Sequence, residues 1–263
     1  MNRDLNRNAY KTTGVVRHYA QLNRLQPAEQ NVLERFRPQL SSMSMLDIGV
    51  GAGRTTQHFA PLAGEYVGID YSAEMVAACR QRCPDVGRLE VGDARQLRYA
   101  DNAFDFILFS FNGMDYVSHT DRLKILQEIY RVGRPGCSLF FSSHNLRAIA
   151  PSFHVKTHLS VNIFSAYVDL VMFGLLRLMN PDASFEKANT ADHLIIRDES
   201  HNFRLRTYYI CPSAQVQQLK FCFHQIEIYS WRRGLILEAS DSAFREDRWL
   251  YYLCKVDARA KAA

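Results

Sequence analysis

The stretch LDIGVGAG, from Leu46 to Gly53, constrains the fold more than any other part of this chain. Its three glycines lie at alternate positions between an apolar strand pattern and a helical pattern. Glycine accepts backbone conformations that other residues avoid, and a turn without Cβ atoms lets a ligand approach outward-pointing amide N–H groups. The turn therefore predicts a ligand site at the carboxyl end of the first strand of a parallel α/β sheet.

The apolar pattern around this turn predicts the rest of the sheet. Short apolar runs alternate with helical patterns from Met43 to Ser143, which is typical of consecutive βαβ units. Strands are expected at 44–48, 66–69, 89–91, 104–109, 138–142, 225–229 and 249–255, and helices at 54–60, 73–82, 121–132 and 212–221. The apolar period of the core also returns at 205–210. The last two strands are close enough in sequence to be antiparallel. The expected fold is α/β: a Rossmann-like, doubly wound sheet of seven mostly parallel strands with an antiparallel last strand.

Changes in the spacing of apolar residues along the sequence predict that the chain has three parts. Residues 1–42 are expected to form an N-terminal helical lid, because apolar residues recur there at helical spacing. The core is assigned to 43–144 and 205–258. Residues 145–204 are rich in aromatic and aliphatic side chains, and they predict an inserted helical substrate cap. Simple packing of that region against the sheet edge is an open alternative.

Composition excludes several classes of protein. Hydrophobic residues at 47% and charged residues at 22% match a globular protein and not a disordered one. The net charge of +5 is too small for a dedicated nucleic-acid binder. The six cysteines form no CxxC pair, so we expect reduced thiols, a cytoplasmic location and no metal site. The apolar stretch 161–179 contains Asp169 and Arg177, so no transmembrane segment is expected, although a membrane-touching or ligand-covering helix stays open.

Three aspartates lie at the ends of consecutive predicted strands. Asp47 precedes the glycines, Asp70 follows the second strand, and Asp93 follows the third. An acid at the second position accepts the hydroxyls of a ribose, and one at the third can accept an adenine amino group. Asp47 would repel a pyrophosphate but could hold an ammonium group. The pattern favours a cationic nucleoside over a dinucleotide, although each aspartate could instead cap the next helix.

In combination, these motifs resemble those of the class I S-adenosylmethionine-dependent methyltransferases. The matching motifs are LDIGVGAG, GID, GDA, FDFILFSFNGMDYV and LQEIYRVGRPGCSLFFSSHN, which lie within residues 43–145. The resemblance implies S-adenosylmethionine as cofactor and S-adenosylhomocysteine as product. It places Gly49, Gly51 and Gly53 on the methionine portion, Asp70 on the ribose, Asp93 and Ala94 at the adenine with Tyr71 and Met75 packed on it, and Phe109 and Ser110 near the sulfonium. It also implies an N-terminal helix with Tyr19 or Tyr10 near the cofactor carboxylate.

Residues for the methyl acceptor are expected beyond the fourth and fifth strands. His144 directly follows the fifth strand and is the leading candidate for a general base, since histidine exchanges protons near neutral pH. Asn112 and Tyr116 follow the fourth strand and are expected at the substrate mouth. Four other histidines, at 119, 154, 158 and 201, are weaker candidates.

The chemistry of the acceptor is bounded by the end of the fourth strand. It reads Ser110-Phe111-Asn112-Gly113, without the Asn-Pro-Pro-aromatic or Asp-Pro-Pro-aromatic signature with which methylases of this family hold base amino groups. We therefore expect a bacterial-style methyltransferase for an N or O atom of a small organic molecule, with no nucleic-acid partner favoured. A homodimer is compatible with the sequence. The alternatives are an RNA or tRNA methyltransferase and a catalytically silent, S-adenosylmethionine-binding partner subunit.

Overall fold

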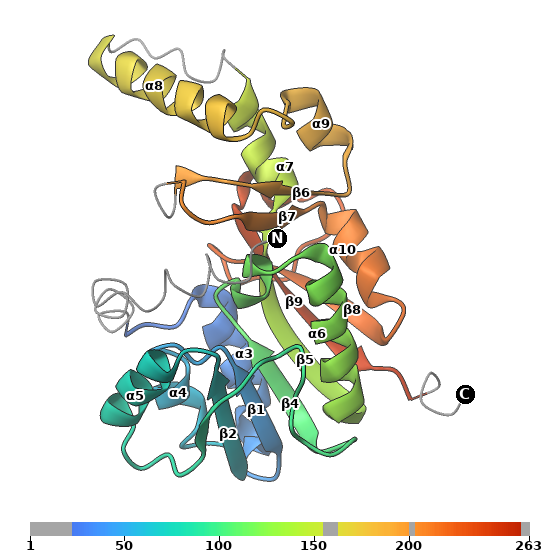
Figure 1. Ribbon diagram of the computed structural model, residues 1–263. Helices are drawn as coiled ribbons and strands as arrows, with labels where there is room; N and C mark the ends of the chain where they lie inside the picture. Colours follow the sequence, from blue (N-terminus) through green and yellow to red (C-terminus); the bar gives the residue numbers. More distant parts are fainter. Residues whose placement is uncertain (1–22, 155–162, 200–202, 259–263) are drawn as a thin grey trace.

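The structure is a computed structural model that describes residues 23–154, 163–199 and 203–258 (Figure 1). Within these ranges nine strands form one sheet. They are β1 (Ser44–Ile48), β2 (Glu65–Asp70), β3 (Leu89–Val91), β4 (Phe104–Phe109), β5 (Gly133–Asn145), β6 (His193–Ile196), β7 (Thr207–Ile210), β8 (Phe223–Ser230) and β9 (Trp249–Val256). The α/β class, with mostly parallel strands and antiparallel last strands, is confirmed.

The sheet follows the order β3-β2-β1-β4-β5 through parallel pairs. At β5 it divides. The antiparallel β9 pairs with most of that long strand and carries β8 on its other side, whereas β7 pairs with its last two residues and carries β6. The expected count of seven strands is therefore too low. β6 comes from the region assigned to a helical cap, and β7 lies within 205–210, where the core period was expected to return.

Helices cover both faces of the sheet. The helical elements are α3 (Pro27–Leu40), α4 (Thr56–Phe59), α5 (Ala73–Arg82), η1 (Gly113–Tyr116), α6 (His119–Val132), α7 (Leu146–Ile149), η2 (Ala150–Phe153), α8 (Ile163–Met179), α9 (Phe185–Thr190), α10 (Pro212–Leu219) and α11 (Ala243–Glu246). In α3, Val32 and Phe36 pack on Phe106 and Phe140. A separate cluster holds Ile129 of α6 with other strand residues. The sheet is thus doubly wound. Residues 1–22 of the expected N-terminal lid lie outside the described residues.

Serine caps position two helices at the carboxyl edge of the sheet. The Ser72 hydroxyl accepts the Met75 N–H at 3.2 Å where α5 begins, and the Ser118 hydroxyl accepts the Asp121 N–H at 3.1 Å where α6 begins. Such caps satisfy amide groups that have no partner within the helix. Both helices begin beside the edge where the parallel strands end.

The region 145–204 has a small apolar core of its own. Leu146, Phe153, Leu176 and Ile196 pack there with Tyr209 of β7. Figure 1 shows α8 projecting beyond the carboxyl end of β5, and this helix exposes Tyr167 and Leu178. Within the described residues, no helix combines the length and apolar character needed to span a bilayer.

Candidate functional site

A cleft of about 450 Å³ opens at the carboxyl ends of β1, β2 and β4. We call the part formed by the glycine turn and the ends of β2 and β3 the glycine-turn side, and the part formed by residues 110–116 with their neighbours the β4–β5 side. Ten of the expected residues line the cleft: Gly49, Gly51, Asp70, Tyr71, Met75, Asp93, Ala94, Phe109, Ser110 and Tyr116. The tertiary fold therefore gathers the ends of β1, β2, β3 and β4 and the turns after them around one cavity.

The three glycines of the turn have different surroundings. All adopt positive φ, between +54° and +86°, which side chains other than glycine disfavour. A Cβ on Gly49 would lie 3.1 Å from the Phe109 ring, whereas one on Gly51 would meet nothing within 4 Å. A Cβ on Gly53 would meet Cys79 of α5 at 3.1 Å. Gly53 therefore differs from expectation, because it lets α5 pack closely and does not line the cleft.

Asp70 presents a buried carboxylate to the cleft. One oxygen accepts the Gly51 N–H at 3.0 Å, and the other accepts the Ser72 N–H at 2.9 Å. The residue is only 7% exposed, and this burial raises the pKa of its carboxyl to about 6 despite those bonds. Each oxygen has a further lone pair, so both can still accept a hydroxyl from a ligand.

Asp47 is placed differently from expectation. Its Oδ2 accepts the Thr55 hydroxyl at 2.8 Å and the Tyr66 hydroxyl at 2.7 Å, and the residue is 1% exposed. Burial raises the pKa of its carboxyl to about 7. Asp47 does not line the cleft, so this position does not support the expected contact with an ammonium group. Its hydrogen bonds instead fix the end of β1 below the glycine turn.

Asp93 lines the far end of the glycine-turn side. Its carboxylate forms an ion pair with Arg95, with Nη2 and Oδ2 2.5 Å apart, and it also accepts the Arg95 N–H at 2.9 Å. Tyr71, Met75 and Ala94 line the same part of the cavity. These apolar surfaces and a half-exposed acid form a slot with one polar edge.

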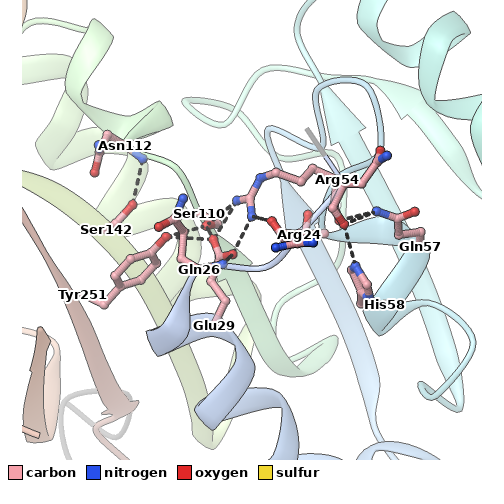
Figure 2. A network of polar contacts seen from close by, with 12 residues as sticks. Arg24, Gln26, Glu29, Arg54, Gln57, His58, Ser110, Asn112, Ser142 and Tyr251 are labelled. Atoms are coloured by element: carbon pink, nitrogen blue, oxygen red, sulfur yellow. Dashed lines mark hydrogen bonds and ion pairs between the residues drawn. The ribbon is translucent and has the colours of Figure 1, made fainter. Parts of the chain in front are cut away.

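A buried ion pair and its hydrogen-bond partners lie next to the β4–β5 side of the cleft, which Arg54 and Ser110 reach (Figure 2). Glu29 of α3 receives Nη1 of Arg54 at 2.5 Å and Nη2 at 2.6 Å, together with the Tyr251 hydroxyl at 2.7 Å and the Ser110 hydroxyl. Burial opposes ionisation of Glu29, but the bonds from Arg54 and Ser110 outweigh it and lower the pKa of its carboxyl. The guanidinium of Arg54 also lies 4.8 Å from the Phe111 ring centroid.

This network brings together segments that are far apart in the sequence. Arg54 directly follows the glycine turn and lines the cleft, whereas Glu29 and Tyr251 are 222 residues apart. None of these three residues is among the candidates predicted from the sequence. The position of Arg54 beside the glycines was a usable signal, but no local pattern marks Glu29 or Tyr251.

Asn112 and His144 lie behind the wall of the cleft. Neither lines it, which differs from the expected substrate-binding positions. Phe111 and Asn112 have φ of +56° and +60°, a conformation that costs energy for non-glycine residues and often occurs at functional sites. Tyr116 does line the cleft, and its ring packs edge-on against His144 at 6.3 Å between centroids. Tyr116 thus connects His144 to the cavity.

The remaining candidates are divided between two places. Tyr10, Tyr19, His158 and His201 lie outside the described residues. His119 stacks on His193 with centroids 4.4 Å apart and bonds to the Tyr208 hydroxyl at 2.8 Å, and His154 packs against Phe185. None of the described residues of 145–204 lines the cleft. The described part of the expected cap therefore does not cover the cavity in this structure.

The described residues contain no cluster of three or more His, Cys, Asp or Glu side chains suited to a metal. All six cysteines, which lie within the described ranges, are free thiols.

The fold and the cleft define a Rossmann-like protein with a cavity at the carboxyl edge of its sheet. Residues 45–136 match the family described as methyltransferase domain. A demethylmenaquinone methyltransferase of Paenarthrobacter aurescens is 30% identical over 141 residues, covering 53% of this chain and 51% of that protein. A norajmaline N-methyltransferase of Rauvolfia serpentina is 35% identical over 123 residues, covering 44% of this chain and 40% of that protein. The chain thus spans about half the length of these curated relatives.

A solved structure of phosphoethanolamine N-methyltransferase 1 from Haemonchus contortus, in complex with phosphoethanolamine and S-adenosylhomocysteine, has the same fold. Its TM-score is 0.58 at 16% identity, and the likeness covers 98% of this chain and 50% of that chain. These findings support a class I S-adenosylmethionine-dependent methyltransferase domain in this chain, matched at residues 45–136.

Proposed function

We propose that this protein transfers a methyl group from S-adenosylmethionine to an N or O atom of a small organic molecule. The observation that carries the proposal is Asp70: a buried carboxylate with spare acceptor capacity, facing a cleft beside a glycine turn. Hydrogen bonds from two ribose hydroxyls would offset the burial that now raises its pKa to about 6. When bound, the cofactor supplies a methyl group already activated by a positive sulfur.

The lining residues fit this cofactor along the length of the cleft. In this proposal Asp70 holds the ribose, the backbone at Gly49 and Gly51 supports the methionine portion, and Asp93 with Ala94 lies at the adenine. Tyr71 and Met75 offer apolar surface for the base, while Phe109 and Ser110 border the sulfonium end. Tyr19 stays a candidate for the cofactor carboxylate.

The acceptor is proposed to enter from the β4–β5 side. Phe111 and Tyr116 present aromatic rings there, and alignment of reactants with exclusion of water is the main contribution that methyl transfer requires from the protein. The two relatives described above are named for a quinone precursor and an alkaloid, which supports a small organic acceptor. We assign cofactor binding to the core, 43–144 and 205–258, and keep a covering role for 1–42 and 145–204 as a proposal.

Calorimetric titration of the full chain with S-adenosylmethionine, S-adenosylhomocysteine and NADH tests the cofactor. We expect micromolar binding of the first two and none of NADH. Binding of NADH alone would contradict the proposal. Transfer of a radiolabelled methyl group to a panel of small hydroxyl and amine compounds, with bulk tRNA as comparison, then tests the acceptor class: cofactor binding with labelling of tRNA alone would favour the RNA alternative.

His144 is proposed as the base where the acceptor must lose a proton. Replacement of His144 by Gln should lower the methyl transfer rate while leaving S-adenosylhomocysteine affinity within about twofold, because the ring does not line the cleft. An unchanged rate across the pH range would remove His144 from this role.

A further inference from the structure

A buried polar network lies behind the β4–β5 side and centres on Asp115 of η1. Its Oδ1 accepts Nη1 of Arg122 and the Ser143 hydroxyl, the latter at 2.9 Å. Its Oδ2 accepts the backbone N–H of His144 at 2.7 Å and lies 2.8 Å from Nδ1 of the same residue. Asp115 and Arg122 are both fully buried, so solvent screens neither charge.

Arg122 uses its other donors within the same network. It bonds to the Met114 carbonyl at 3.3 Å, the Ser143 hydroxyl at 3.1 Å and Oε1 of Gln215 at 2.5 Å. A buried ion pair is often no more stabilising than apolar residues of the same volume. The pair instead orients the Asp115 carboxylate, which is held by several donors so that Oδ2 contacts the His144 imidazole.

The network determines which imidazole nitrogen carries the proton. A carboxylate only accepts hydrogen bonds, so Nδ1 of His144 must be the donor to Asp115. In the uncharged ring Nε2 then carries a lone pair. Among the described residues, its polar neighbour is Nδ2 of Asn112 at 3.5 Å, a long contact, and Oδ1 of Asn112 is buried without a hydrogen-bond partner. Two acceptor atoms are thus weakly satisfied near Tyr116.

The charges around His144 favour a neutral acceptor. The carboxylate that contacts its ring is Asp115, which Arg122 already neutralises, while Tyr116, Tyr209 and Trp249 pack around it as uncharged rings. An ammonium group would find no spare negative charge in this part of the described structure. Flat aromatic surfaces and a lone pair engaged only in a long contact suit a planar molecule that bears a hydroxyl.

We propose, building on the methyltransferase function above, that Asp115 and Arg122 are positioning residues for His144. They hold Nε2 ready to take the proton of a phenolic or enolic hydroxyl on an acceptor that enters past Tyr116, the residue through which the 10% exposed imidazole borders the cleft. The O–H bond breaks and its proton goes to Nε2. The oxygen keeps the electron pair and forms the bond to the methyl carbon, whose bond to sulfur breaks with its electrons left on sulfur. His144 ends as an imidazolium that still donates from Nδ1 to Asp115. A phenol, with an ordinary pKa of about 10, loses this proton far more readily than an alkyl alcohol.

Nitrogen NMR of histidine-labelled full-length protein, saturated with S-adenosylhomocysteine at pH 8, reads the tautomer directly. We expect a protonated Nδ1 and a bare Nε2 for His144, identified as the signal lost in His144→Gln. The reverse tautomer in the wild-type protein would overturn the proposal. Asp115→Asn should release this preference, whereas Asp105→Asn, at the opposite end of β4 in an exposed ion pair with Arg134, should leave the signal unchanged.

The acceptor class is tested on the wild-type protein, so no variant has to fold. We expect millimolar catechol to shift the Nε2 signal and benzylamine to leave it in place. Any other pattern overturns the hydroxyl assignment. Calorimetry with S-adenosylhomocysteine on the same sample separates this result from failure of the proposed function, because loss of cofactor binding would defeat the methyltransferase assignment itself.

Discussion

The two sides of the cleft each bury an aspartate, and the two carboxylates are satisfied in different ways. Among the described residues, Asp70 on the glycine-turn side is held by backbone N–H groups alone. Asp115 on the β4–β5 side receives side-chain donors from Arg122, Ser143 and His144. A carboxylate with spare capacity beside a cavity suits a ligand, whereas one filled by the protein suits the support of a neighbour. Burial alone therefore does not reveal which aspartate binds.

Removal of the cation on the β4–β5 side should produce the largest effect. Arg122→Met leaves Asp115 charged and unpaired in a fully buried place, so we expect a loss of about 3–5 kcal/mol in the free energy of unfolding. Urea denaturation measures it. The matched control is Arg134→Met, whose ion pair with Asp105 is partly exposed and should change stability by less than about 1 kcal/mol. Equal losses of unfolding free energy in the two variants would contradict the conclusion that Asp115 depends on Arg122 for its burial.

The glycine-turn aspartate should instead affect binding. Asp70→Ala removes an acceptor of two proposed ribose bonds and should weaken S-adenosylhomocysteine by about 1.5–3 kcal/mol, which calorimetry measures. Asp101→Ala, in an exposed pair with Arg131, provides the control and should bind normally. Normal affinity in a folded Asp70→Ala protein would remove the ribose assignment.

Substitutions at Gly49 and Gly51 should distinguish an effect on packing from an effect on ligand contact. Alanine at position 49 or 51 must adopt positive φ, which costs about 1–2 kcal/mol of stability for a side chain with Cβ. Gly49→Ala also presses on Phe109, whereas the new methyl in Gly51→Ala enters open space in the cleft and should weaken cofactor affinity more than stability. Denaturation and calorimetry on both proteins measure the difference. Gly87→Ala, with open space and no positive φ, should behave as the wild-type protein.

Cofactor binding should depend on pH through Asp70. Because burial raises the pKa of its carboxyl to about 6, protonation below that pH removes one acceptor and should weaken affinity about tenfold by pH 5 relative to pH 7. The raised pKa has the opposite sign for folding without ligand: the stabilisation is complete below about pH 4 and is lost as the pH rises through about 6. Calorimetry across this range should show a flatter profile in Asp70→Asn, and identical profiles would contradict the assignment.

The smallest effect on stability is expected at the hydrogen bond between Tyr251 of β9 and Glu29 of α3. Tyr251→Phe removes one of several donors to Glu29, so we expect a loss of about 1 kcal/mol in the free energy of unfolding. Tyr167→Phe on the exposed face of α8 is the control and should be neutral in the same thermal or urea unfolding measurement. A loss of several kcal/mol would mean that Arg54 and Ser110 do not hold Glu29 without Tyr251.

Some elements could be predicted from the sequence because their pattern lies in residues that are neighbours along the chain. The strand at 104–109 and the helix at 73–82 have the bounds of β4 and α5, because each apolar period is bounded by polar or turn residues. The predicted number of strands was wrong, because the pairing of β6 with β7 depends on tertiary contacts that the spacing of apolar residues does not show. Gly53 and Asp47 belong to the expected motif, but their orientation away from the cleft became visible only in three dimensions.

The βαβ core, the glycine turn and the acid at the end of β2 follow from the order of residues along the chain, because each depends on residues close together in the sequence. The other side of the cleft depends on how the chain packs in three dimensions. There Glu29, Arg54, Ser110 and Tyr251 meet from four distant segments, and Asp115 meets Arg122 and His144 across an irregular turn. A buried charge can find its partner anywhere along the chain, so its satisfaction is a property of the packed fold and not of a local motif.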